Sequence, residues 1–137
     1  MPSQVLVVED SPLQAKMYKS LFAHLDDVHL YYAQNGQEAL DKLALEPRIQ
    51  LILLDINMPK MDGLTFLDRM KTEGYSSIPV IVISTEGKDE DIRKALHLGA
   101  RAYVKKPWKP AEVHELIDNV LSTAITRTDG RTAGPRV

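Results

Sequence analysis

The stretch VLVVEDSP at residues 5–12 joins an apolar run to two acids and then to a helix start. A continuous apolar run of this length is typical of a short strand that is buried on both faces of a parallel sheet. Ser11 is a favourable N-cap and Pro12 a favourable first helical residue, so a helix is expected directly after the acids. The stretch therefore predicts a strand, turn and helix with Glu9 and Asp10 at the carboxyl end of the strand.

Similar apolar runs recur along the chain and alternate with amphipathic segments. We expect strands at residues 4–8, 28–33, 50–54, 79–84 and 102–105. Apolar residues at helical spacing predict a helix after each strand, and in the first of these helices Leu13, Met17, Leu21 and Leu25 share one face. Gly99 stands where a C-cap glycine of the fourth helix belongs.

This alternation predicts the α/β class, with a doubly wound five-stranded parallel sheet of the flavodoxin-like (βα)5 type. Periodicity alone does not fix the order of the strands. We adopt the order 2-1-3-4-5, because it makes the strands at 4–8 and 50–54 neighbours and so brings their terminal acids together.

Composition restricts the possible functions. The chain has 137 residues, a net charge of −2 and no cysteine. A length of this kind fits one domain, which we place at residues 1–124, followed by a disordered tail or linker stub at 125–137. Disulfides and thiolate sites are excluded, and the weak negative charge favours neither nucleic acid nor an anionic membrane. Because residues 1–4 carry no signal segment, we expect a cytoplasmic protein.

The carboxyl ends of the first and third strands carry the candidate metal ligands. Asp55 directly follows the apolar run at 51–54, as Glu9 and Asp10 follow the run at 5–8. Mg²⁺ takes oxygen ligands and is held in proteins by one or two carboxylates and phosphoryl oxygens. We expect Asp10 and Asp55 to bind Mg²⁺ or Mn²⁺, with Glu9 holding a coordinated water and the backbone carbonyl of Asn57 as a further ligand.

Two more strand ends carry groups suited to a phosphoryl group. The fourth strand ends at Ser84-Thr85, where a hydroxyl can donate to an oxygen on phosphorylated Asp55, and Lys106 follows the fifth. Three carboxylates are then balanced by the ion and the lysine. An ionised Asp55 in this setting is a candidate nucleophile toward phosphorus, because carboxylates form aspartyl-phosphate intermediates in covalent catalysis.

Four segments together resemble the response-regulator receiver domain of the CheY-like single-domain type. They are VLVVEDS at 5–11, LLDINMPKMDG at 53–63, PVIVIST at 79–85 and GARAYVKKPW at 99–108. Each is common alone, whereas their order and spacing are specific, and the resemblance covers residues 4 to about 123.

The resemblance implies a role for each site residue. Asp55 would be the phospho-acceptor, Lys106 the phosphate-pairing lysine, Ser84 the switch hydroxyl and Tyr103 the switch aromatic. The residues implied to bind Mg²⁺ are Glu9, Asp10, Asp55 and the Asn57 carbonyl. Those implied to tune the lifetime of the phosphoryl group are Asn57, Thr85 and Glu86.

The resemblance also implies partners and an output. A histidine kinase or a phosphotransfer protein would donate the phosphoryl group, and the domain would assist its own phosphorylation and dephosphorylation without being a turnover enzyme. The output surface would comprise the helix at 89–98, the strand at 102–105 and the helix at 110–121. Its target would be an unknown protein or a detached effector domain.

Two other functions share parts of this pattern. A Mg²⁺-dependent aspartyl-phosphate phosphatase of the haloacid-dehalogenase kind also uses an aspartate at a strand end. That family needs a second aspartate two residues on as general acid, and Asn57 stands there. A flavodoxin-like FMN carrier would need a Ser/Thr/Gly-rich phosphate loop after the first strand, where Glu9 and Asp10 would repel a phosphate.

Overall fold

The computed structural model describes residues 3–22, 28–55, 63–84, 89–105 and 110–128. The chain divides into two compact units, Met1–Lys106 and Pro107–Val137. Within the described ranges, the first unit holds the sheet and four helices, and the second holds one helix. No helix within the described ranges combines the length and the apolar character needed to cross a bilayer.

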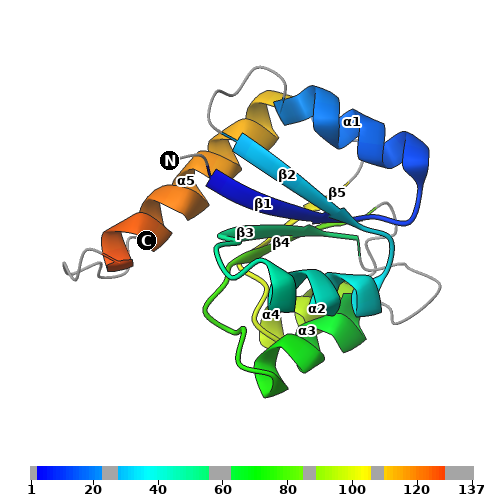
Figure 1. The fold of residues 1–137 in the computed structure, drawn as a ribbon, viewed down its shortest axis with the longest axis vertical. Helices are drawn as coiled ribbons and strands as arrows, with labels where there is room; N and C mark the ends of the chain where they lie inside the picture. The colour runs from blue at the N-terminus through cyan, green and yellow to red at the C-terminus, as the bar shows by residue number, and fades with distance from the viewer. Residues whose placement is uncertain (1–2, 23–27, 56–62, 85–88, 106–109, 129–137) are drawn as a thin grey trace. The chain divides into compact units, whose positions relative to one another are not determined.

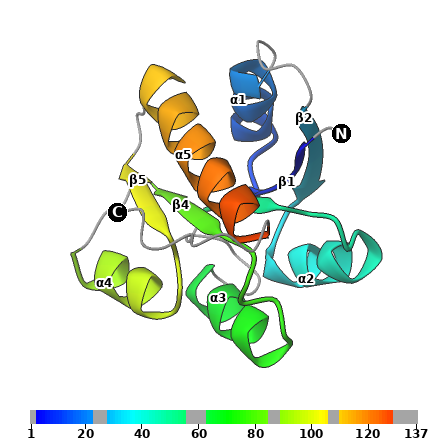
Figure 2. The same ribbon diagram turned by 90° about the vertical axis from the view of Figure 1, so that its left-hand side faces the viewer.

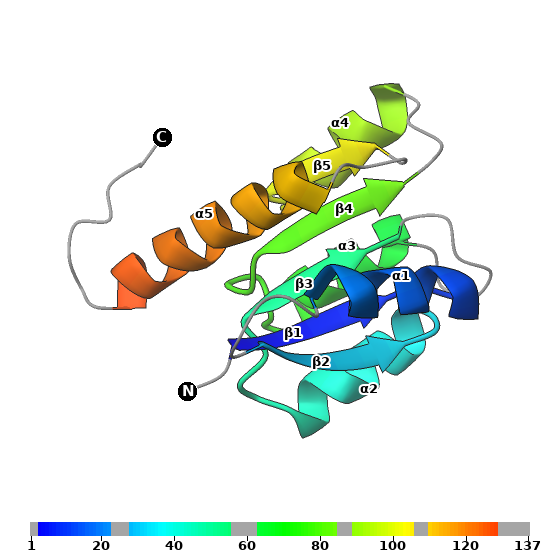
Figure 3. The same cartoon turned by 90° about the horizontal axis from the view of Figure 1, so that it is seen from above.

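The sheet has five parallel strands in the order β2-β1-β3-β4-β5. The strands are β1 (Ser3–Val8), β2 (Val28–Ala33), β3 (Leu51–Leu54), β4 (Val80–Ser84) and β5 (Ala102–Lys105). Their arrows run in one direction in Figure 3. The predicted fold class and strand order are confirmed, and every predicted strand boundary lies within one residue of the observed one.

Helices cover both faces of this sheet. They are α1 (Pro12–Phe22), α2 (Gly36–Leu45), α3 (Gly63–Thr72) and α4 (Asp89–His97). Within the first unit, α1 lies on one face of the sheet, and α2, α3 and α4 lie on the other (Figures 1 and 2). Residues 5–8 of β1 and all of β3 are buried, which explains why these stretches are apolar without alternation.

The core is continuous beneath α2 and α3. Each residue of β3 is at most 1% exposed. From the helices, Ala39, Leu40 and Leu43 of α2 belong to the same buried cluster, as do Phe66, Leu67 and Met70 of α3. Their spacing of three and four residues places each set on a single helical face.

Helix α1 buries a different face from the predicted one. Tyr18, Leu21 and Phe22 are buried, whereas Leu13 is 68% exposed and Met17 is 45% exposed. The expectation that Leu13 and Met17 share the packed face with Leu21 is therefore wrong, and Leu25 lies outside the described residues. Two aromatic side chains bury more apolar surface than a leucine and a methionine, which favours the observed rotation of the helix.

Two helix ends have the caps that their sequences favour. The Asn35 side chain accepts a hydrogen bond from the backbone N–H of Glu38 at 3.0 Å and so caps the start of α2. Gly99 has φ of 114° after α4, and the N–H of Ala100 donates to the Ala95 carbonyl at 2.9 Å. This is the Schellman pattern, so the prediction of a C-cap glycine is confirmed.

The second unit contains helix α5 (Pro110–Thr128). Val113, Ile117 and Val120 are each at most 5% exposed and recur at helical spacing. The helix continues beyond 121, so residues 125–128 of the expected tail are helical. Residues 121–128 contain neither glycine nor proline, and the next glycine is Gly130, so the sequence holds no helix-breaking residue before the end of α5.

Candidate metal centre

The pairing of β1 with β3 places their terminal acids at one edge of the sheet. Val8 is aligned with Leu54, the last residues of the two strands. Just beyond them, the backbone N–H of Asp55 donates to the Val8 carbonyl at 3.1 Å, and the N–H of Glu9 donates to the Ala33 carbonyl at 2.9 Å. Backbone hydrogen bonds thus hold both acids in the register of the sheet.

The three predicted acids converge there. Ligand oxygens of Glu9, Asp10 and Asp55 all lie within 4.8 Å of one another, and this is the only such group of three metal-ligating side chains in the described part of the chain. Glu9 is 5% exposed and Asp55 is 9% exposed, whereas Asp10 is open to solvent. The site therefore has a buried side and an accessible side, as a partly hydrated ion requires.

A backbone group that the sequence did not single out orients Glu9. The N–H of Ser11 donates to Glu9 Oε2 at 3.3 Å, and the Ser11 hydroxyl oxygen accepts from the N–H of Gln14 at 3.3 Å. Ser11 is thus the predicted N-cap of α1 and also positions a neighbouring acid. Almost every residue has a backbone N–H, so the amino-acid sequence does not indicate this second role of Ser11. Only the geometry of the turn shows it.

The electrostatics of the cluster favour a divalent cation. Three carboxylates at this separation repel one another, and the repulsion is stronger on the buried side, where solvent screens less. An all-oxygen donor set of two buried acids and an exposed one is the chemistry that Mg²⁺ and Mn²⁺ accept. The residues present therefore fit the predicted ion.

The remaining predicted site residues are only partly described. Ser84 ends β4, two positions past the residue aligned with Leu54, and it is aligned with Lys105 of β5. The backbone of Ser84 therefore lies on the strand next to β3 at the acidic edge. Four other predicted residues lie outside the described ranges: Asn57, Thr85, Glu86 and Lys106.

Tyr103 on β5 has its hydroxyl buried without a hydrogen-bond partner among the described residues. Its ring packs against the core cluster. Burial raises the pKa of the Tyr103 hydroxyl, and the nearby charge of Asp91 on α4 raises it further. An unsatisfied buried hydroxyl is uncommon and costs free energy, which makes this side chain a candidate for a second conformation.

Fold and acids together define a flavodoxin-like (βα)5 domain with an acidic site at the carboxyl edge of its sheet. The family model of the response regulator receiver domain matches residues 5–118, and the chain belongs to this family.

Similar proteins include bacterial chemotaxis proteins. The chain is 31% identical over 121 residues to a Campylobacter jejuni chemotaxis protein CheY homolog, across 88% of this chain and 93% of that protein. It is 37% identical over 121 residues to the Treponema pallidum chemotaxis protein CheY, with coverages of 88% and 83%. A Borrelia burgdorferi structure, the CheX-CheY-BeF3-Mg+2 complex, matches with TM-score 0.79 and 33% identity, over 88% of this chain and 90% of that chain.

Proposed function

We propose that this receiver domain is a phosphorylation-controlled signalling switch whose acceptor is Asp55. The observation that carries the proposal is the convergence of Glu9, Asp10 and Asp55 within 4.8 Å at the edge of the sheet. Family membership supports it, because the acids stand where receiver domains are expected to bind metal and phosphoryl groups.

The proposed reaction transfers a phosphoryl group from a phosphohistidine to Asp55. A carboxylate oxygen of Asp55 attacks phosphorus and a P–O bond forms. The P–N bond breaks, and the donor imidazole nitrogen keeps its electron pair. The fixed register of Asp55 against Val8 supports this role, since transfers of this type depend mainly on positioning and charge stabilisation.

Glu9, Asp10 and Asp55 would hold Mg²⁺ or Mn²⁺, with the Asn57 carbonyl as a further protein ligand. When bound, the ion neutralises carboxylate charge and stabilises negative charge on the phosphoryl oxygens. Within this proposal the Ser11 N–H keeps Glu9 turned toward the site, and Lys106 and the Ser84 hydroxyl pair with the phosphoryl group. Thr85, Glu86 and Asn57 would set its lifetime.

The phosphoryl group would be read out through α4 and β5, which contact each other. In this scheme Ser84 moves toward the phosphoryl group and Tyr103 turns, so that phosphorylation changes the balance between two conformations. The Tyr103 hydroxyl is buried without a hydrogen-bond partner among the described residues, and a second conformation in which it finds one would be lower in free energy. Helix α5, the third predicted element of this surface, belongs to the second unit and stays a prediction.

The phosphoryl donor would be a histidine kinase or a phosphotransfer protein. Leu13 and Met17 lie on the exposed face of α1, in the first turns after Asp10 and Ser11. These two exposed apolar side chains lie one helical turn apart at the start of the helix that follows the acidic pair, and they would form a suitable contact for a protein that must approach Asp55.

The decisive experiment is labelling with acetyl phosphate. The protein should become phosphorylated at Asp55 in Mg²⁺, as resolved by phosphate-affinity electrophoresis and mass spectrometry, and EDTA should prevent it. Asp55→Asn should abolish the label because an amide is a poor nucleophile. Asp68→Asn, at an exposed acid of α3, is the matched control and should label normally. Stoichiometric labelling of Asp55→Asn at another residue would overturn the proposal.

A further inference from the structure

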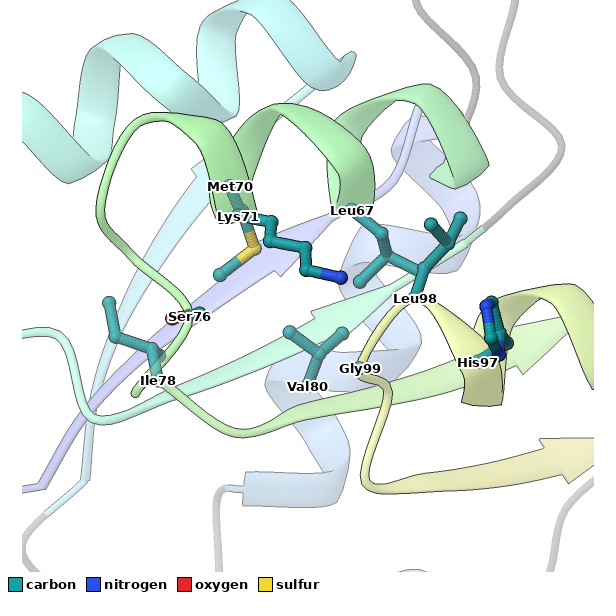
Figure 4. Close-up of a pocket in the computed structure, with 9 residues that line it drawn as sticks. All are labelled: Leu67, Met70, Lys71, Ser76, Ile78, Val80, His97, Leu98 and Gly99. Atoms are coloured by element: carbon teal, nitrogen blue, oxygen red, sulfur yellow. The ribbon is translucent and has the colours of Figure 1, made fainter.

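Helices α3 and α4 are separated by a surface groove on the side of the sheet away from α1. The groove has a volume of about 680 Å³ and is lined by Leu64, Glu90, Arg93, Lys94, His97 and Leu98. A second hollow, of about 120 Å³, continues it and shares His97 and Leu98. Figure 4 shows this second hollow, with Lys71 projecting over it from α3 and His97 at the end of α4.

The floor of this α3–α4 groove is apolar. Leu64 and Leu98 pack against the core cluster but are only partly buried, so each presents its remaining surface to the groove. The second hollow adds Leu67 and Val80 to the floor. Side chains held by the core on one side form a rigid surface, on which an apolar group can be buried without rearranging the protein.

The rim of the groove is basic. Arg93 and Lys94 come from α4 and Lys71 from α3. Among the described lining residues the one acid is Glu90, which already pairs with Lys94 at 3.3 Å. Arg93 and Lys71 form no ion pair with any residue that the structure describes. Three cations against one carboxylate give the described residues of the rim a charge of +2, although the whole chain carries −2.

We propose that the α3–α4 groove binds an acidic amphipathic peptide segment of a partner protein. Apolar side chains of the segment would occupy the floor of leucines, and its carboxylates would face Lys71 and Arg93 on opposite walls. Charge complementarity of this kind steers association and fixes the orientation of the bound segment. Helix-in-groove recognition uses this combination of apolar anchors and a polar border.

The shape of the groove favours a peptide over other ligands. It follows α4, whose nine residues span about 14 Å, which matches two to three turns of a helical segment. Small-molecule sites usually enclose most of their ligand, whereas this groove is open along its length. A lipid surface is favoured by a convex amphipathic face and by overall positive charge, and this protein offers a concave face and a net charge of −2.

This inference goes beyond the phosphoryl chemistry and does not rest on it, because no residue of the acidic cluster lines the groove. The test therefore uses the full chain without a phosphoryl donor. A library of random short peptides is selected against the immobilised protein. The recovered peptides should carry Asp or Glu together with apolar residues at helical spacing. They should also shift the amide NMR signals of Leu64, Arg93 and Leu98.

A charge-reversed variant makes the test specific. The double variant Lys71→Glu and Arg93→Glu changes one exposed cation on each wall and should weaken the selected peptides at least about tenfold in fluorescence polarisation. The double variant Lys16→Glu and Lys19→Glu on α1 makes the same charge change elsewhere and should leave their affinity unaltered. Replacing the apolar residues of a selected peptide with alanine should also abolish binding.

Three results would overturn the proposal. The first is selected peptides without acids or with unchanged affinity for the Lys71 and Arg93 variant. The second is NMR shifts confined to another surface. The third is a concentration-dependent shift of the groove signals in the protein alone, accompanied by dimerisation in sedimentation equilibrium, which would assign the groove to a second copy of this chain.

Discussion

The backbone N–H of Asp55 donates to the carbonyl oxygen of Val8 at 3.1 Å, so the residue after β3 is fixed against the last residue of β1. Glu9 and Asp10 follow Val8 directly, and their carboxylates reach within 4.8 Å of that of Asp55. A single backbone hydrogen bond thus links the proposed acceptor to the proposed metal ligands. The register of these three acids depends on the pairing of two strands, and the Ser11 N–H in the following turn orients Glu9.

Removing one acid should stabilise the protein without metal and should reduce the stabilisation that metal gives. In EDTA, Asp55→Asn should raise the free energy of unfolding by about 2 kcal/mol, because it removes repulsion between nearby, partly buried carboxylates. In saturating Mg²⁺ the variant should gain less than the unaltered protein, whose stabilisation is about 2.7 kcal/mol at a hundred times the Kd. Urea unfolding in the two buffers measures both effects.

Asp68→Asn is the control for this pair of measurements, because Asp68 is exposed on α3. It should alter neither the stability in EDTA nor the gain in Mg²⁺. If Asp55→Asn were destabilising without metal, the three acids would not be the dominant repulsive contact in the folded protein.

Tyr103→Phe should stabilise the unphosphorylated protein by about 1 kcal/mol, since it removes a buried hydroxyl that lacks a partner among the described residues. Urea unfolding is the measurement. Tyr75→Phe is a fair comparison, because Tyr75 also packs against the core cluster while its hydroxyl is not a buried unsatisfied group in the described chain. A loss of stability in Tyr103→Phe would mean that the hydroxyl has a stabilising partner.

Tyr103 should also affect the stability of the protein at high pH. Burial and then the charge of Asp91 raise the pKa of Tyr103 above its ordinary value of 10.0, so the folded protein holds the phenolic proton more tightly than the unfolded chain does. The resulting stability is present below pH 10 and is lost as the pH rises through the folded pKa. The free energy of unfolding should therefore fall less steeply above pH 10 in Tyr103→Phe, and equal slopes would refute this contribution.

Asn35→Ala should destabilise the protein by about 1 kcal/mol, because it removes the side-chain acceptor for the Glu38 N–H at the start of α2. Thermal unfolding gives the measurement. Gln34→Ala is a suitable control, since Gln34 contributes its backbone N–H, which donates to Glu38 Oε1 at 3.1 Å, and that donor survives the substitution. Equal losses in the two variants would exclude the cap as the cause.

The exposed face of α1 should affect a protein donor but not a small one. The double variant Leu13→Ala and Met17→Ala should lower kcat/KM for transfer from a phosphorylated histidine phosphotransfer protein by about tenfold. Its rate of labelling by acetyl phosphate should stay unchanged, because neither residue belongs to the acidic cluster. Leu45→Ala removes a leucine that is 72% exposed on α2 and should change neither rate. Parallel losses with both donors would place the defect in the site itself.

The sheet could be predicted from the sequence because its strands are short continuous apolar runs that alternate with amphipathic segments, a pattern typical of a parallel α/β sheet. The boundaries of β2 and β5 match their predictions, and the acids after β1 and β3 converge as the strand order requires. The predicted face of α1 was wrong for a specific reason. Leu13, Met17 and Leu21 form one apolar stripe and Tyr18, Leu21 and Phe22 form another, and the choice between them depends on the surface beneath the helix.

Other features depended on information that a single sequence does not carry. The role of the Ser11 N–H follows from the turn between β1 and α1, because every residue except proline has such a donor. The α3–α4 groove depends on the spacing of two helices whose apolar residues individually indicate only a packed face. Leu64 and Leu98 are therefore ordinary core positions in the sequence and become a surface floor only in the folded protein.

Strand β3, whose residues are at most 1% exposed, limits how the protein can respond at Asp55. Displacing such tightly packed side chains would open voids that cost several kcal/mol, according to typical large-to-small substitutions in protein cores. Phosphorylation of Asp55 would therefore leave the backbone and side chains of β3 in place. The proposed conformational change would have to occur in side chains outside this core, where repacking costs less free energy.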